Sequence, residues 1–171
     1  DRLTVGYGMG GASTESIATM PHSKGRWYAE FIVHAGADNE VPNSWTNVGI
    51  RSTANEFGGL TSHGGQLAYG VNRYLRKVGG LRDKDVIGLA MDLTRGQLYV
   101  RHNGAWVGGS PDSGNAILPI VTDRQYVVAV EVGSPGGDYT KTDTWTGNFG
   151  STPFHHPIPK GFEPYGGRRP K

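Results

Sequence analysis

Residues 85–104, DVIGLAMDLTRGQLYVRHNG, carry the strongest strand signal in the chain. From Ile87 to Leu93 every second residue is apolar, which predicts a strand with one face in a core. Gly88 and Ala90 on the other face are small, so a second layer can pack closely there. The TRG that follows turns the chain into QLYVRH, and the Asn-Gly pair after it suits the positive φ angles of a type I′ hairpin. Consecutive antiparallel strands are therefore expected.

Short segments of the same kind recur along the chain. RWYAEFIV at 26–33 alternates in this way, while RKVGGLRDKD at 76–85 has the pattern of a Gly-Gly hairpin connection. β-Branched and aromatic residues fill the gaps between frequent Gly and Pro, and no segment has a full amphipathic helical period. These features predict an all-β fold, an antiparallel β-sandwich of two sheets with little or no helix. The other expected strands are 47–51, 66–72, 118–123, 126–132 and 144–150.

Composition limits the class of protein. The length of 171 residues fits one domain, 1–171, with a lead-in segment at 1–23, a sandwich core at 24–165 and a tail at 166–171. The absence of cysteine excludes disulfides, thiol nucleophiles and Cys-based metal sites. The net charge of +2 does not favour nucleic acid as a partner. No apolar run is long enough to cross a membrane, so membrane insertion is not expected.

Several of these segments resemble the SPRY domain family in order and spacing. DVIGLAMDL, followed by a turn, a strand, the pair NG and then NFG-x-x-PF, is the most specific part, and the resemblance covers most of 24–165. It implies a bent sandwich of the concanavalin-like jelly-roll type, with ligands bound by loops at one end and no catalytic activity. The matching segments are GRWYAEF at 25–31, NVGI at 47–50, LAYGV at 67–71, DVIGLAMDL at 85–93, LYVRHNG at 98–104, LPIV at 118–121, and NFGSTPF and PKGFEP within 148–164.

The segment WVGGSPDSG at 106–114 refines the resemblance. A Trp after the NG turn, followed by Gly-x-Pro-x-x-Gly, is similar to SPRY-like domains of bacterial and phage proteins, including tail fibres. The segment therefore favours a microbial or viral source. Because Trp106 lies on the return of a hairpin, we expect it to anchor the Gly-rich loop to the sheet rather than to serve as a ligand platform.

Catalytic and metal chemistry find little support in the sequence. A retaining glycosidase needs two carboxylates about 5 Å apart, and no two Glu residues lie within five positions of each other. His155 and His156 are adjacent, so they point to opposite sides of an extended chain and are poor ligands for one metal ion. No nucleophile elbow is present, and the Gly-rich 6–13 lacks the following helix of a phosphate loop. We expect no enzyme, no cofactor and no metal.

The candidate binding residues lie in the loops 36–46, 52–64 and 133–143 and beside a basic segment at 73–84. Their aromatic faces, amides and charges suit recognition of a protein or a glycan, although each could instead anchor its own loop. The basic segment could bind an anionic surface, or could carry charge only to stay solvated. The candidates are Asn43, Trp45, Arg51, Phe57, His63, Arg73, Tyr74, Arg76, Asp138 and Tyr139.

Three functions are compatible with these observations. The leading hypothesis is a non-enzymatic recognition domain of a phage tail fibre or a bacterial surface protein, with a host receptor, glycan or partner protein as ligand. The second is a structural module that contacts only neighbouring subunits of a virion or secretion apparatus, as a homotrimer if it belongs to a fibre. The third is a glycan hydrolase. The expected location is the virion or the bacterial surface.

Overall fold

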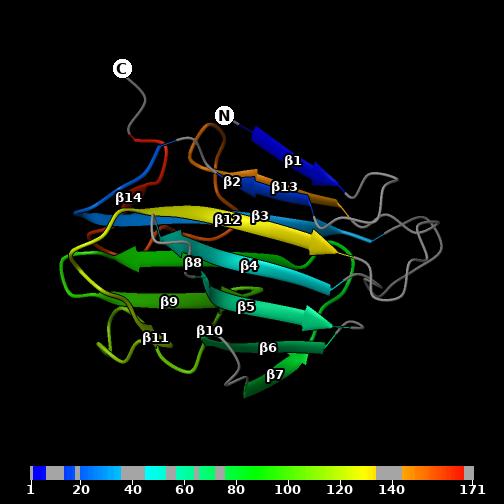
Figure 1. Cartoon of the computed structure of the whole chain (residues 1–171), viewed down its shortest axis with the longest axis horizontal. Coiled ribbons are helices and arrows are strands. Elements are labelled where there is room, and N and C mark those ends of the chain that lie inside the picture. Colours follow the sequence, from blue (N-terminus) through cyan, green and yellow to red (C-terminus); the bar gives the residue numbers. More distant parts are fainter. Residues whose placement is uncertain are drawn as a thin grey trace.

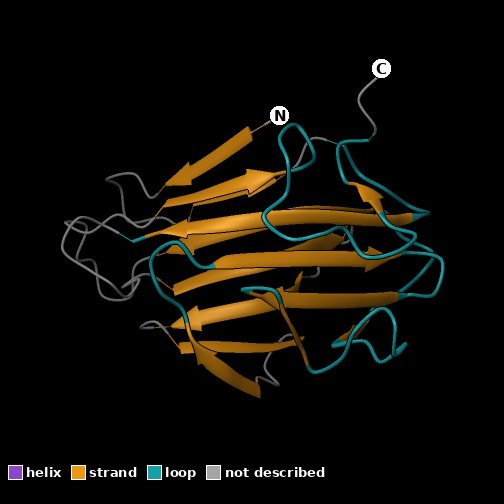
Figure 2. Ribbon diagram, turned by 180° about the vertical axis from the view of Figure 1, so that it is seen from behind, coloured by secondary structure: helices purple, strands orange, loops and turns teal. Residues whose placement is uncertain are grey.

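Strands account for the regular structure of the described part of the chain, and no helix occurs in it (Figure 2). The computed structural model describes residues 2–6, 14–17, 20–35, 45–52, 57–63, 66–71, 76–133 and 144–167. Side chains are described for 20–35, 47–52, 80–130 and 144–167. The prediction of an all-β sandwich of two sheets is confirmed. Across these ranges, no helix has the length and apolar character that crossing a membrane would require.

The first sheet is centred on β3 and β8, which contain the two clearest strand signals of the sequence (Figure 1). Its strands are antiparallel except for β14, which runs parallel to β3. In sheet order they are β1 (Arg2–Gly6), β13 (Thr144–Asn148), β3 (Arg26–His34), β8 (Val86–Asp92), β9 (Gln97–His102) and β10 (Ala105–Val107), with β11 (Leu118–Pro119) on β9 and β14 (Glu163–Pro164) on β3.

The second sheet is an antiparallel arrangement in which β12 lies next to β4. The two edges of this sheet are β2 and β7. In sheet order the strands are β2 (Thr14–Ile17), β12 (Tyr126–Gly133), β4 (Trp45–Ser52), β5 (Phe57–His63), β6 (Gln66–Val71) and β7 (Arg76–Gly80).

Three expected features of the chain differ in the structure. The segment 52–64, expected as a loop, contains β5, because residues 57–63 pair with β4 on one side and β6 on the other. The segment 118–123 is a strand only at Leu118–Pro119, because Ile120 N donates to Gly96 O and Val121 N to the Tyr126 hydroxyl instead of joining a ladder. The expected Gly-Gly connection is wrong, since the two glycines lie within β7 and pair with β6. The differences at β11 and β7 involve short strands at the edges of the sheets, where apolar alternation is weak.

The lead-in segment also contributes to the sandwich. β1 pairs with β13 at one edge of the first sheet, and β2 pairs with β12 at one edge of the second. Further along, an isolated antiparallel bridge joins His22 to Tyr126, the first residue of β12. The sequence from 1 to 23 thus supplies an edge strand to each sheet, in addition to leading into β3.

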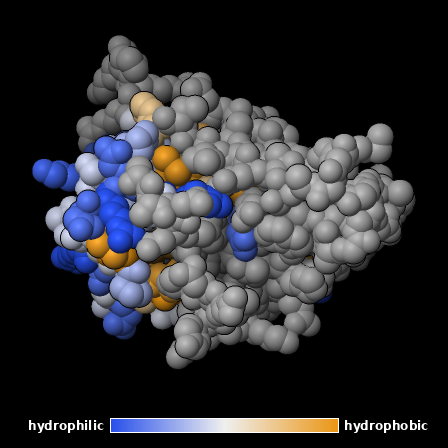
Figure 3. Space-filling model, viewed as in Figure 1, coloured by the Kyte–Doolittle hydropathy of each residue, from blue (hydrophilic) through white to orange (hydrophobic). Residues whose placement is uncertain are grey.

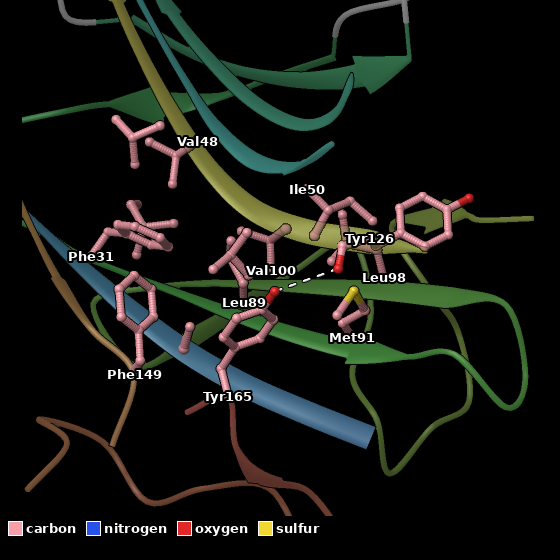
Figure 4. Packing of buried hydrophobic residues seen from close by; sticks show 14 of the residues in the cluster. Phe31, Val48, Ile50, Leu89, Met91, Leu98, Val100, Tyr126, Phe149 and Tyr165 are labelled. Atoms are coloured by element: carbon pink, nitrogen blue, oxygen red, sulfur yellow. Dashed lines mark hydrogen bonds between the residues drawn. The ribbon is translucent and has the colours of Figure 1, made fainter. Parts of the chain in front are cut away.

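The core lies between the sheets and is built from the alternating residues of the central strands (Figure 4). Leu89 and Met91 of β8 are 1% exposed, and they pack in one cluster with Ile50 of β4 and Val128 of β12. Tyr165 closes the cluster after β14. Its hydroxyl donates to Met20 O at 2.6 Å, and burial raises the pKa of this phenol to about 12.

A second cluster covers the outer face of the first sheet. It contains Tyr28, Ala90, Tyr99 and Phe162, and the chain between β13 and β14 lies over it. Gly88 is required here, because a Cβ at this position would come within 2.5 Å of the Tyr28 hydroxyl oxygen. The small residues of β8 therefore admit a covering layer, as the sequence predicts.

Candidate functional site

One end of the sandwich collects several of the connections that pass between the two sheets. We call it the loop end, and define it by the strand termini Gly6, His34, Trp45, Gly133 and Thr144. Gly6 pairs with Thr144, Thr144 with His34, and Gly133 with Trp45, so these termini lie in neighbouring positions. The arrowheads of β1 and β12 accordingly point to the same side in Figure 1. The connections 7–13, 35–44 and 134–143 all start and finish there.

The turn between β7 and β8 fixes the point at which the chain leaves β3. Lys84 N donates to Val33 O at 2.8 Å, and Val33 N donates to Asp85 O at 3.1 Å. The Asp83 carboxylate accepts a hydrogen bond from Ala35 N at 2.9 Å. The first residue after β3 is therefore held by a side chain from another element, which gives the connection 35–44 a rigid start.

Asp85 lies at the centre of a polar network at the same end. Its Oδ2 accepts from Arg82 N and from His102 Nε2, both at 2.8 Å, and its Oδ1 accepts from Asn103 Nδ2 at 2.6 Å. Asn103 has a φ of 47°, as the type I′ prediction requires, and its side-chain oxygen accepts from Val86 N. The network ties the 81–85 turn to the β9–β10 hairpin and gives the loop end a rigid rim.

A buried carboxylate holds the chain segment that covers the outer face. Glu30 is 0% exposed and accepts hydrogen bonds from His155 N at 2.7 Å and His156 N at 3.0 Å. It also accepts from the Tyr28 hydroxyl at 2.8 Å. Burial, and then the negative charge of Glu30, raise the pKa of Tyr28 far above its ordinary value, so this hydroxyl remains a donor. Glu30 thus has a structural role.

Trp106 belongs to the same outer layer. The Arg101 guanidinium lies 4.4 Å from its ring centroid, and the Tyr99 ring meets it edge-on at 6.4 Å. Arg101 also donates to Pro157 O at 3.0 Å. These contacts on both sides support the interpretation of Trp106 as an anchor of its loop.

The buried carboxylates of the described part are all engaged in structural contacts. They are Glu30, Asp85 and Asp92. Asp92 forms an ion pair with Arg26 at 3.0 Å and accepts from the backbone amides of Thr94 and Arg95. A general acid or base needs a carboxyl group that can reach a substrate, and these groups face the protein itself. Within the described ranges, no group of three or more His, Asp or Glu residues is placed to hold a metal ion.

Strand pairing places two of the candidate binding residues at the loop end. Trp45 opens β4 opposite Gly133, and His63 closes β5 one position beyond the pair Thr46–Ser62. Only the backbone of Trp45 and His63 is described. Asn43, Asp138 and Tyr139 lie outside the described residues.

Three other candidates lie at the opposite end, which we call the far end and define by Arg26 and Asp92. Arg51 pairs with Phe57 where β4 meets β5, and Arg76 opens β7. Arg73 and Tyr74 lie outside the described residues. The described candidates therefore do not form one site, and the described part of the basic segment, 76–84, runs from the far end to the loop end. Sequence reasoning missed the rim residues Asp83, Asp85, His102 and Asn103, because nothing in their local spacing shows that they meet.

The comparisons with known proteins bear on the fold. Neither a family model nor a curated protein matches the chain. Among solved structures, the SPRY domain of human HERC1 matches with a TM-score of 0.57 and 16% identity, over 84% of this chain and 86% of that one. The chain therefore has a SPRY-like fold.

Two further solved structures are more distant. A GH131 β-glucanase catalytic domain from Podospora anserina has a TM-score of 0.49 and 14% identity, over 88% of this chain and 72% of that one. A mutant of Trypanosoma rangeli sialidase with trans-sialidase activity has a TM-score of 0.45 and 17% identity, over 73% of this chain and 20% of that one. Likenesses at this level do not bear on the activity of this chain.

Proposed function

We propose that this chain is a non-enzymatic recognition module that binds a partner through its loop end. The observation that carries the proposal is the gathering of the connections 7–13, 35–44 and 134–143 at one end, above a rim fixed by Asp83 and Asp85. Loops on a rigid scaffold are the usual position of binding residues, because sequence can vary there without loss of the core. Trp45 and Tyr139 are the aromatic residues proposed to contact the partner.

The proposed setting is a phage tail fibre or a bacterial surface protein, with a host receptor, glycan or partner protein as ligand. Its support is the segment 106–114, whose pattern is similar to microbial SPRY-like domains, together with the contacts that anchor Trp106 at its start. The alternative is a structural module that contacts only neighbouring subunits.

The test measures binding of the whole chain to an immobilised panel of bacterial surface polysaccharides and to intact bacterial cells. Trp45→Ala and Tyr139→Ala are expected to weaken binding about tenfold, the loss of one good contact, without lowering the melting temperature. Phe57→Ala, at the far end, is the matched control and should bind as the unmodified chain does.

Three results would count against this proposal. Equal loss in all three variants would contradict a site at the loop end. Absence of binding, combined with trimers in sedimentation equilibrium, would favour the structural module. Release of reducing ends from the polysaccharides would contradict the non-enzymatic assignment.

A further inference from the structure

Four cations from three distant segments meet at one corner of the far end. Arg26 opens β3 beside Lys24, Arg95 lies in the β8–β9 turn, and Lys160 precedes β14. The turn is joined to β3 by Leu93 N, which donates to Gly25 O at 2.9 Å. We call these four residues the basic corner.

Short contacts hold the corner together. The Arg26 guanidinium lies 4.3 Å from the Phe162 ring centroid. A Cβ on Gly161 would come within 2.6 Å of Arg26 Nη1, so the chain beside Lys160 passes directly against this guanidinium. Asp92 pairs with Arg26 and also accepts from Arg95 N, which places the turn on the other side. The cations therefore share one small region of the surface.

The charge of the corner is poorly compensated. Asp92 is the carboxylate at its centre, and it is 1% exposed and paired with Arg26. Lys24, Arg95 and Lys160 are exposed, and no ion pair of theirs occurs among the described residues. Figure 3 shows hydrophilic side chains crowded at the side of the molecule where β8 ends in Figure 1. Cations gathered in one region reinforce one another, because salt screens exposed charges only beyond about one Debye length, roughly 8 Å at physiological salt.

The field of the corner reaches a neighbouring group. Burial and then Asp92 raise the pKa of Tyr99, while Arg95 and Arg26 act in the opposite direction. The Tyr99 hydroxyl donates to Gln97 Oε1 at 2.5 Å and is not available to a ligand. The phenol therefore reports the presence of both cations without taking part in recognition.

We propose that the basic corner binds acidic polysaccharide, through Lys24, Arg95 and Lys160 with Arg26 as their fixed centre. The aromatic rings beside the corner are occupied, since Trp27 stacks on His22 at 3.9 Å and Phe162 lies beneath Arg26. Single-stranded nucleic acid needs free aromatic faces for its bases, which disfavours it here. A chain of sugar carboxylates needs only repeated cations on an open surface, and the corner offers these.

The experiment uses the whole chain and immobilised polygalacturonate, with neutral dextran as the blank, at low and at physiological salt. K24Q/K160Q is expected to weaken binding at least tenfold and to lower the slope of log affinity against log salt by about two, roughly one for each cation removed. Arg26 is left intact because Asp92 depends on it. Melting temperatures confirm that the variants remain folded.

R82Q/K84N is the matched control, because it removes the same charge from the loop end. Asn is chosen for position 84 because Lys84 has a φ of 66°, which Asn tolerates. This variant should change the affinity less than twofold. Equal losses in both variants would show that net charge alone drives binding, and would overturn the proposal.

The ligand class is tested with two further probes, a single-stranded DNA oligonucleotide and vesicles with anionic lipid. Binding to either one that is tighter than binding to polygalacturonate would overturn the polysaccharide assignment, as would no binding to polygalacturonate at low salt. Trp45 opens β4 at the opposite end, and Tyr139 belongs to the connection 134–143, whose flanking strands meet that end, so their variants should bind polygalacturonate normally. Failure of this proposal and failure of the proposed function are therefore distinguishable.

Discussion

At the scale of single residues, polar side chains join segments that lie far apart in the sequence. Glu30 receives two amides from the chain after β13, and Asp83 receives one from the end of β3. Glu30 alternates with core residues along β3, and Asp83 lies in a turn. Nothing in the local sequence therefore distinguishes either residue from a surface carboxylate. His22 has a comparable role between β2 and β3, and its titration makes this role measurable.

His22 predicts a pH dependence of stability. Its Nε2 lies 3.0 Å from Tyr165 O and its ring stacks on Trp27. Burial lowers the pKa of this imidazole below 6.5, and the hydrogen bond to Tyr165 offsets only part of the effect. As the pH falls below about 6.5, the unfolded chain therefore binds more protons than the folded chain, and stability falls.

The variant His22→Gln isolates this contribution. The stability of the unmodified chain relative to the variant should be larger at about pH 7.5 than at about pH 5, as measured by urea denaturation. A difference that stays constant or grows on acidification would contradict the assignment. His34→Gln, which loses a bond to Thr146 at the loop end, is the matched histidine control.

At the scale of elements, the clearest strands are those with one face in the core. β3, β8, β9 and β12 begin and end within about two residues of their predicted limits, because burial imposes alternation on them. β5 and β7, with the sequences FGGLTSH and RKVGG, have no such pattern. β7 is an edge strand and β5 lies between β4 and β6, and the position of each is set by pairing with neighbouring strands rather than by apolar alternation.

The 81–85 turn predicts a coupling between two elements. Asp83→Ala removes the acceptor of Ala35 N, so hydrogen exchange at this amide should quicken about tenfold, which corresponds to about 1.4 kcal/mol. The measurement is site-resolved exchange by NMR. Asp112→Ala, in the exposed part of the 106–114 loop, should leave the Ala35 amide unchanged. If the Ala35 amide exchanges as slowly in Asp83→Ala as in the unmodified chain, the 81–85 turn does not hold the end of β3.

At the scale of the whole molecule, sequence-distant strands close both sheets. β1 completes the first sheet on β13, and β2 completes the second on β12. The same arrangement gives the molecule two unlike ends, one with the connections 7–13, 35–44 and 134–143 and one with the basic corner. A net charge of +2 gives no sign of this difference.

Deletion of residues 1–17 tests the contribution of the edge strands. The loss of β1 and β2 should lower the free energy of unfolding by roughly 2–4 kcal/mol and expose the edges of β12 and β13 to other chains. Urea denaturation and sedimentation velocity measure the two effects. Deletion of residues 1–6 removes β1 alone and should give an intermediate loss. Unchanged stability in both deletions would mean that the pairings of β1 with β13 and of β2 with β12 contribute nothing to the free energy of unfolding.

The sequence by itself determined the all-β class, the two-layer sandwich and the central strands, because alternation, turn residues and small residues are local signals of burial. It also pointed to the Asn103 turn and to the role of Trp106. Only the tertiary structure decided which residues share an end. Lys24, Arg95 and Lys160 come together, and the loop candidates divide between two ends, because strand register and sheet order are set by packing between distant segments.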